Sequence, residues 1–183
     1  MSEPVGELVP ALSGPAPEPI RVLLPSAIGP LGVELVGSTV TRLLISPSAR
    51  ERRHLTPLGD LDESETFDEI FGRLSEYLAG ARRNLELEYD LGPSGVDAFA
   101  RRVFKEASRV PYGKTRTYKD IAAAAGRPEA YRLALSILLA NPIPLVIPCH
   151  RIVPNKGGLG SFVGGPTKKR WLLKLERESA AQG

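Results

Sequence analysis

The chain has 183 residues, 42% of them hydrophobic, which is enough to build one large domain or two small ones. Its net charge is only +3, and it contains one cysteine and two histidines. A lone cysteine excludes an internal disulfide, and this Cys and His content argues against a structural zinc site. No apolar run approaches the roughly 18 residues of a membrane span, and the acidic N-terminus does not resemble a signal peptide. We therefore expect a soluble, intracellular protein.

The two halves of the chain differ in charge. Residues 1–97 contain 8 basic and 16 acidic side chains, for a net charge of −8, whereas residues 98–183 contain 16 basic and 5 acidic ones, for +11. The second half is therefore suited to meet a polyanion, and nucleic acid is favoured over a membrane because no basic amphipathic anchor is evident. From charge alone, a basic face that is merely solvated is the alternative.

The first half is predicted to be a small α/β domain that follows a tail. Residues 1–19 are rich in Pro, Gly, Glu and Ser, and we expect them to be disordered. Apolar runs at 21–24, 32–36 and 40–45 predict three strands in a small antiparallel sheet. Residues 64–79 place apolar side chains at helical spacing, so this helix should cover one face of the sheet.

Two connecting segments in this half carry no chemical motif. Residues 47–60 have the character of a polar, basic connection, and His54 within it is interpreted as a solvated loop histidine rather than a ligand. The strict alternation of residues 85–89 predicts a short strand. This strand leads to a boundary at Gly92-Pro93, where the pattern becomes helical.

The second half is predicted to be mostly helical. Residues 94–110 form a helix with one apolar face, and residues 117–126 form a second helix that begins with a capping-box pattern. A third helix over 128–140 follows a tight turn that contains a glycine, and such a pair makes a helix-turn-helix. A plain helical hairpin is the alternative that the sequence leaves open. The last helix is predicted over 167–177 and includes Glu176.

The only cysteine lies beside a histidine in the segment Asn-Pro-Ile-Pro-Leu-Val-Ile-Pro-Cys-His-Arg-Ile-Val, residues 141–153. Its three prolines fix φ and remove amide donors, so the segment is predicted to be stiff, extended and buried. A thiol next to an imidazole has the parts of a nucleophilic site, because the thiolate is the reactive species. A buried cysteine that acts only as a small hydrophobe is the alternative. Neighbouring side chains of an extended segment point to opposite faces, so His150 would serve Cys149 through an irregular backbone or a bridging water.

This segment resembles the active-site signature of the O6-alkylguanine-DNA alkyltransferases. The resemblance covers essentially everything after Gly92, and more loosely the sheet and helix before it. It implies an α+β protein whose N-terminal domain, residues 20–91, is a small antiparallel sheet with a helix, RNase H-like. The C-terminal domain, residues 92–178, would be mostly helical and winged-helix-like, with the helix-turn-helix, and residues 179–183 would be a flexible tail.

The resemblance also implies a role for each residue of a catalytic group. Cys149 would accept the alkyl group, and His150 would deprotonate it through a water molecule. Glu176 would orient His150, and Asn141 would brace the segment, which follows the logic of nucleophile, base and orienter. Tyr118 would help to rotate the nucleotide out of the duplex and support guanine as the leaving group.

The same resemblance implies contacts with DNA and with the extruded base. Arg132 would enter the duplex and fill the gap left by that base, with the protein bound in the minor groove. The residues expected to contact DNA are Tyr118, Arg132, Ala134, Leu135 and Arg151, and those expected to contact the substrate base are Ile152, Leu159 and Val163. Arg151 would also help to tie the active site to the chain around it.

The chain departs from the family pattern at two positions. Leu135 stands where the family has a glycine that allows close approach to the groove floor, so the depth of DNA engagement is expected to differ. Residues 154–165 contain five glycines and predict a loop whose backbone approaches a ligand closely. In this loop Val163 replaces a serine, so a hydroxyl is lost while the backbone amide stays. We expect altered substrate preference or rate more than inactivity.

Together these features predict a DNA repair protein that transfers an alkyl group from O6 of an extruded guanine to Cys149, irreversibly and once per molecule. Its partner would be double-stranded DNA that carries O6-alkylguanine, and no cofactor, metal or membrane is implied. We expect a monomer, with cooperative binding to DNA left open, and a cytoplasmic location, associated with the nucleoid in a prokaryote. Two alternatives stay open: a damage-recognition module of the same fold that flips modified guanines without reacting, and a cysteine hydrolase.

Overall fold

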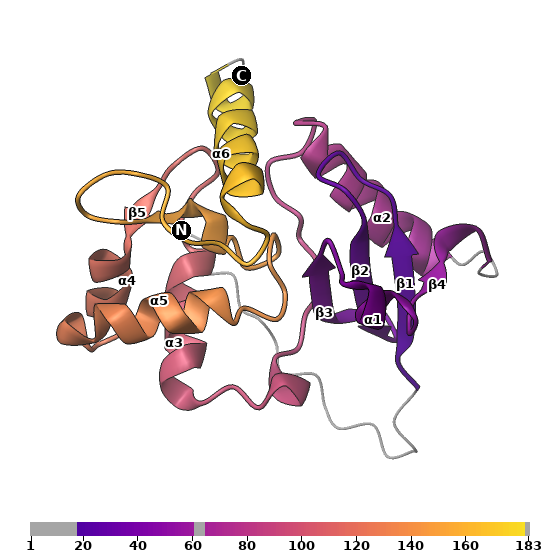
Figure 1. Cartoon of the computed structure of the whole chain (residues 1–183), viewed down its shortest axis with the longest axis horizontal. Coiled ribbons are helices and arrows are strands. Elements are labelled where there is room, and N and C mark those ends of the chain that lie inside the picture. Colours follow the sequence, from indigo (N-terminus) through magenta and orange to yellow (C-terminus); the bar gives the residue numbers. More distant parts are fainter. Residues whose placement is uncertain (1–17, 61–64, 182–183) are drawn as a thin grey trace.

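The computed structural model describes residues 18–60 and 65–181. Its N-terminal half contains the main sheet and lies on the right in Figure 1, and its helical C-terminal half lies on the left. The tail expected over residues 1–19 and the end of the chain at 182–183 fall mostly or wholly outside the described residues. Within the described ranges, no helix is long and apolar enough to cross a membrane.

The N-terminal sheet has four strands in the order β3-β2-β1-β4. Strands β1 (Ile20–Leu24), β2 (Leu31–Val36) and β3 (Thr39–Ile45) pair antiparallel, which confirms the three predicted strands. The fourth strand, β4 (Thr56–Pro57), pairs parallel with β1 and was not predicted, because two residues are too short to show alternation.

The segment predicted as a polar connection, residues 47–60, is more ordered than the sequence indicated. It contains the short helix α1 (Ala49–Arg52), where Ser48 and Glu51 form a capping box, and a 3-10 turn over Leu58–Asp60. A capping box satisfies two backbone donors at a helix start, which stabilises even one turn of helix. His54 is exposed, as predicted for a solvated loop histidine.

Helix α2 (Glu65–Leu78) covers one face of the sheet, as predicted. Its inner side chains are buried in one core with those of the strands: Ile70, Phe71, Leu74, Tyr77 and Leu78. The strand predicted over residues 85–89 does not form. Glu86 has a positive φ of 50°, which breaks an extended run, and only an isolated bridge joins Tyr89 to Val40 of β3.

The C-terminal half begins with helix α3 (Ala98–Ser108), which is capped by Asp97 and starts four residues after the predicted start at residue 94. Helix α4 (Tyr118–Ala124) has the predicted capping box between Thr117 and Asp120. A 3-10 turn then leads into α5 (Tyr131–Leu139), and α3, α4 and α5 pack on one another. The predicted pair of helices joined by a tight turn is confirmed.

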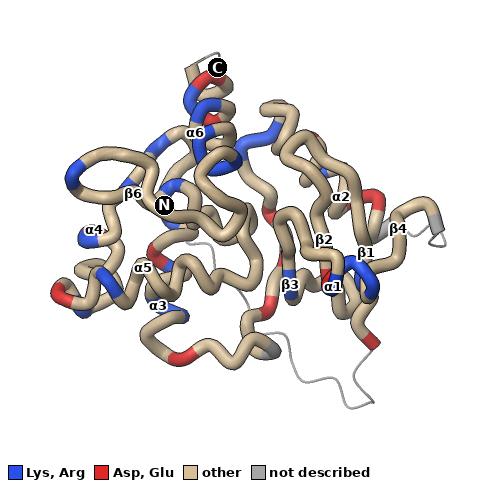
Figure 2. The backbone as a smooth tube through the Cα atoms, in the orientation of Figure 1, with Lys and Arg blue, Asp and Glu red and all other residues tan. Residues whose placement is uncertain are grey.

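Two further elements complete this half. Strands β5 (Arg116–Thr117) and β6 (Ile152–Val153) form a small parallel pair that the sequence did not indicate. Helix α6 (Pro166–Ala181) extends through residues 179–181, which were expected in a flexible tail. Figure 2 shows Lys and Arg positions on α4 and along α6, in line with the basic charge of this half.

The two halves meet at the segment that carries the cysteine. The N–H of Leu43 in β3 donates to the carbonyl oxygen of Pro142 at 2.8 Å. Ile45 lies so close to the glycine-rich loop that a Cβ on Gly164 would be 3.0 Å from its Cγ2. The edge of the N-terminal sheet therefore supports both the cysteine segment and the loop beyond it.

Candidate active site

The cysteine segment is buried, as predicted, but it is not extended. Leu145 has a positive φ of 76°, and the N–H of Ile147 donates to the carbonyl oxygen of Ile143 at 3.0 Å, so the chain turns back on itself. Cys149–Arg151 then form a single 3-10 turn. The prediction of extended backbone was wrong because prolines restrict φ at their own positions without preventing a turn between them.

Asn141 ties this turn to the cysteine. Its Nδ2 donates to the carbonyl oxygen of Ile147 at 2.9 Å and to Sγ of Cys149 at 3.2 Å, and its Oδ1 accepts from the N–H of Ile143 at 3.1 Å. A hydrogen bond donated to sulfur favours the thiolate. Asn141 thus has the geometry of a brace, and it also stabilises negative charge on Sγ.

The thiol of Cys149 is protonated at neutral pH. Burial raises its pKa to about 11, against the opposing effects of the hydrogen bond from Asn141 and the charge of Lys169. Its side chain is almost fully buried. Because the thiolate is the nucleophilic form, a reaction at Sγ needs a base within reach.

His150 is held as a neutral base. Its Nε2 lies 2.7 Å from Oε1 of Glu176 and donates to that carboxylate, so Nδ1 carries the lone pair. Burial lowers the pKa of His150, although Glu176 acts in the opposite direction. Within the described part of the chain, the buried Nδ1 has no hydrogen-bond partner. A free lone pair on a neutral imidazole next to a thiol can accept the thiol proton.

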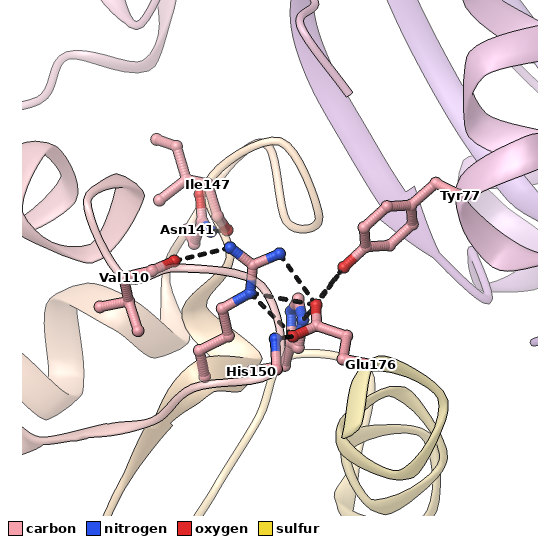
Figure 3. A network of polar contacts seen from close by, with 8 residues as sticks. Tyr77, Val110, Asn141, Ile147, His150 and Glu176 are labelled. Carbon is pink, nitrogen blue, oxygen red and sulfur yellow. Dashed lines mark hydrogen bonds and ion pairs between the residues drawn. The ribbon is translucent and has the colours of Figure 1, made fainter. Parts of the chain in front are cut away.

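Glu176 is the centre of a buried network (Figure 3). Besides His150, its carboxylate accepts from the Nε and Nη2 of Arg151 at 2.9–3.0 Å, from the N–H of Gly113 at 3.0 Å, and from the hydroxyl of Tyr77. Burial alone would raise the pKa of Glu176, but the hydrogen bonds and charges of His150 and Arg151 lower it to about 2. The carboxylate is therefore ionised at all physiological pH values.

Arg151 was expected both to contact DNA and to tie the active site to the chain around it, and the structure places it inside the protein, where only the second role is possible. Its side chain is 6% exposed, and its Nη1 donates to the carbonyl oxygen of Val110 at 2.7 Å while the rest of the guanidinium binds Glu176. A carboxylate without a partner cannot be buried cheaply, so this arginine compensates its charge. The buried pair explains why Arg151 is not available to bind a phosphate.

Tyr118 and Lys169 lie on the other side of the cysteine. Burial raises the pKa of Tyr118, and the nearby Cys149 adds to this rise. The amine of Lys169 is 3.4 Å from the Tyr118 hydroxyl and donates to the carbonyl oxygens of Ile152 and Ser161. No carboxylate pairs with it in the described residues, and burial lowers its pKa to about 8. This amine is thus a buried proton donor beside a phenol.

Helix α5 presents only part of its predicted DNA surface. Arg132 is exposed and lies over the ring of Tyr131, and Leu135 is half-buried. Ala134, expected to contact DNA, is fully buried on the face toward the domain core. Leu133, which precedes it, is 48% exposed.

The residues expected to contact the substrate base differ in exposure. Ile152 is fully buried, Leu159 is half-buried and Val163 is 41% exposed. Phe162, beside Val163, packs edge-on against the ring of His150 at 6.0 Å. A Cβ on Gly160 would lie 2.7 Å from the Tyr118 hydroxyl, so a glycine is required where this loop passes the phenol.

Two residues of the site were missed by the sequence reasoning. Lys169 lies in the run Lys168-Lys169-Arg170, which has the appearance of a solvated basic face, but it precedes the buried Leu172 by three residues and Glu176 by seven. That helical spacing would have placed it inward. Tyr77 was recognised only as an apolar position of α2, and no local signal connects it with a residue 99 positions away.

A buried thiol, a neutral imidazole oriented by a carboxylate, and a helix-turn-helix in a basic half define a DNA-binding protein with a cysteine nucleophile. Comparison with known proteins makes this more specific. A family model described as the DNA binding domain of 6-O-methylguanine DNA methyltransferase matches residues 98–178.

Whole relatives match as well. The methylated-DNA-protein-cysteine methyltransferase of Mycobacterium bovis is 37% identical over 85% of this chain and 90% of its own length, and that of Methanosarcina barkeri is 32% identical over 80% and 97%. The crystal structure of the Mycobacterium tuberculosis O6-methylguanine methyltransferase superposes with a TM-score of 0.75 at 34% identity, over 88% of this chain and 94% of that one, and that protein has also been solved in complex with DNA. The chain belongs to the methylated-DNA-protein-cysteine methyltransferase family, and its small N-terminal sheet and helical C-terminal half confirm the predicted α+β class.

Proposed function

We propose that this protein repairs DNA by transferring an alkyl group from O6 of guanine to Sγ of Cys149. The observation that carries this proposal is the arrangement of three groups. The only cysteine is buried beside a neutral histidine, and Glu176 fixes the tautomer of that histidine. Family membership supplies the substrate class, and the relatives that share it are named for methyl transfer from DNA to a cysteine.

The transfer is a single displacement. The thiol proton of Cys149 passes to Nδ1 of His150 through a water molecule, and Sγ then attacks the alkyl carbon. The S–C bond forms as the C–O6 bond breaks, and the electron pair of that bond goes to the guanine ring. Tyr118 donates a proton to the departing guanine, and Lys169 returns one to the phenol. The thioether has no route back to a thiol, so each molecule acts once.

The substrate base has to leave the duplex before it reacts, because O6 of a stacked guanine is out of reach of a buried thiol. In this proposal Arg132, exposed near the start of α5, enters the minor groove and fills the gap. Tyr118 stands at the start of α4 beside the cysteine and assists rotation of the nucleotide. Leu135 affects how closely α5 approaches the floor of the groove, and Val163 affects how the loop contacts the O6 group.

The finer assignments belong to the same proposal. The three antiparallel strands covered by α2 support an RNase H-like N-terminal domain over residues 20–91. The helix pair followed by β6 and the glycine-rich loop supports a winged-helix-like domain over residues 92–178. We propose a monomer that acts on double-stranded DNA with O6-alkylguanine in the cytoplasm, and in a prokaryote it would work at the nucleoid, where the genomic DNA lies.

The proposal is tested by the mass of the intact protein after incubation with a duplex that contains O6-methylguanine. We expect a gain of about 14 Da, one methylene, that saturates at one per molecule. Cys149→Ala and the unmodified duplex serve as controls and should show no gain. Tight binding to the modified duplex without any gain would replace repair with the alternative of a damage-recognition module that does not react.

A further inference from the structure

One contact of the acid-base network comes from the other half of the protein. Tyr77 lies in α2, on the N-terminal sheet, yet its hydroxyl donates to Oε1 of Glu176 and lies 3.3 Å from Nε2 of His150. Figure 3 shows the ring reaching toward Glu176 from α2, on the far side from α6. The N-terminal half therefore contributes a side chain to a site whose other residues all follow Gly92.

The hydroxyl of Tyr77 is a permanent donor. The side chain is 1% exposed, and burial together with the charge of Glu176 holds its pKa well above the usual range. The phenol thus stays protonated at any pH at which the protein functions. Since a buried hydroxyl needs a partner, the hydrogen bond to Glu176 fixes the orientation of the ring and of the carboxylate together.

The position of this hydrogen bond gives it a role in the reaction. The Oε1 atom of Glu176 receives the hydroxyl of Tyr77, the Nε2–H of His150 and the guanidinium of Arg151. Donors that share one oxygen compete for its charge. The hydroxyl of Tyr77 therefore reduces the degree to which Glu176 stabilises the protonated form of His150. It also holds Oε1 in position for its hydrogen bond with Nε2.

We propose, on the basis of the alkyl-transfer function above, that Tyr77 is a positioning residue of this site: it holds Glu176 so that His150 stays neutral and keeps the Nδ1 lone pair free to accept the thiol proton. No other residue of the N-terminal half reaches the carboxylate among the contacts of the described residues. The domain boundary thus runs through the catalytic network, which gives the N-terminal domain a chemical function.

Several charged groups set the protonation of His150, and Tyr77 acts among them. Glu176 favours the imidazolium, whereas Arg151 and Lys169 oppose it. The titratable and charged groups that act on the imidazole come from its own turn, from α6 and from α2: Arg151, Lys169, Glu176 and Tyr77. Removing the hydroxyl leaves more of the carboxylate charge to act on His150, so the pKa of His150 should rise.

The test compares Tyr77→Phe with Tyr112→Phe. Tyr112 packs edge-on against Tyr77 at 5.9 Å, but its buried hydroxyl has no hydrogen-bond partner in the described part of the chain, so this control removes the same atom from a neighbouring ring. Two readouts are used. One is the single-turnover rate of methyl transfer from a duplex with O6-methylguanine, measured between pH 5 and pH 9. The other is the NMR titration of the two histidines, which is observed without DNA.

We expect Tyr77→Phe to transfer about tenfold more slowly at neutral pH, as for the loss of one charge-assisted hydrogen bond. The acid limb of its pH-rate profile and the titration midpoint of His150 should both move to higher pH. Tyr112→Phe should match the wild type in both measurements. A lower rate with an unmoved titration would mean that Tyr77 only packs, and an unchanged rate and titration would mean that its hydroxyl has no role. Either result overturns the inference.

A second variant covers the case in which Tyr77→Phe does not fold. Placing 3-fluorotyrosine at position 77 makes the hydroxyl a stronger donor, so the midpoint of His150 should move in the opposite direction, to lower pH; an unmoved or higher midpoint contradicts the inference. A wild-type protein that transfers no alkyl group refutes the proposed function only, because the histidine titration tests the position of Tyr77 without the reaction.

Discussion

Replacing Arg151 with leucine should destabilise the fold strongly. The arginine donates to Glu176 through Nε and Nη2 and to the carbonyl oxygen of Val110 through Nη1, all in the protein interior. Arg151→Leu leaves the fully buried Glu176 carboxylate without its counter-charge. Removing one partner of a buried pair costs about 3–5 kcal/mol. For a chain of this size that corresponds to a fall in Tm of about 6–20 °C.

The measurement is thermal and urea unfolding of the wild type, Arg151→Leu, Glu176→Gln and the double variant. The losses in free energy of unfolding of the two single variants should add up to more than the loss of the double variant. Each single variant leaves one buried partner unpaired, whereas the double variant removes both partners. Arg109→Leu is a matched control, since Arg109 pairs with Glu106 at 2.6 Å but is 57% exposed. Its cost should stay below about 1 kcal/mol.

The pH dependence of stability gives a second check. The pKa of Glu176 in the folded protein, about 2, lies below its ordinary value of 4.5, so the ionised carboxylate stabilises the fold above about pH 4.5. This contribution, of order 3 kcal/mol, is lost as the pH falls from 4.5 to 2. Glu176→Gln should lack that part of the acid dependence. The reasoning is refuted if Arg151→Leu keeps its Tm within about 2 °C and instead loses DNA affinity with a smaller salt dependence, as a phosphate contact would.

Three further changes test other parts of the site. Lys169→Met should slow transfer below pH 8 and abolish the loss of rate above it, because the amine, whose pKa is about 8, is a charged donor only below that pH; a pH-rate profile with the alkaline limb intact would contradict this. Asn141→Ala removes three hydrogen bonds of the cysteine turn and should cost about 2–4 kcal/mol in urea unfolding while slowing transfer, and a normal rate would exclude the brace. Arg132→Ala should slow transfer from duplex DNA by more than about tenfold but leave the reaction with the free base O6-benzylguanine unchanged, because only extrusion of the base needs a side chain to fill the gap. The distant Arg50→Ala is the control.

The sequence predicted the elements that have a regular period. The three strands of the sheet, α2 and the α4 and α5 pair follow from alternation, helical spacing and capping residues, which act locally. The shape of the cysteine segment does not follow from such local patterns, because it depends on a positive φ at Leu145. Leucine rarely adopts a positive φ, so the residue type does not predict this conformation, which the surrounding packing imposes.

The composition of the site shows the same division. The group of Cys149, His150 and Glu176 was predicted from the resemblance, and the structure brings them together. The expected DNA contact of Arg151 was wrong and the polar role of Tyr77 was missed because their partner is distant in the sequence: Arg151 compensates a carboxylate 25 residues away, and Tyr77 reaches it across the domain boundary. A basic residue beside the active cysteine has the appearance of a DNA contact until a buried counter-charge is known.

The high pKa of Cys149 fits a protein that can react only once. A thiolate exposed at neutral pH would be consumed by any electrophile, whereas a buried thiol with a pKa of about 11 is nearly inert. His150 is neutral and carries its proton on Nε2, so it can accept the thiol proton without a prior change in its own protonation. In the proposed reaction the hydrogen bond from Asn141 and the charge of Lys169 act on Sγ inside the protein, where they stabilise the thiolate more than they would in water. Burial, which suppresses the thiolate in the free protein, thus becomes the condition under which its neighbours stabilise it most.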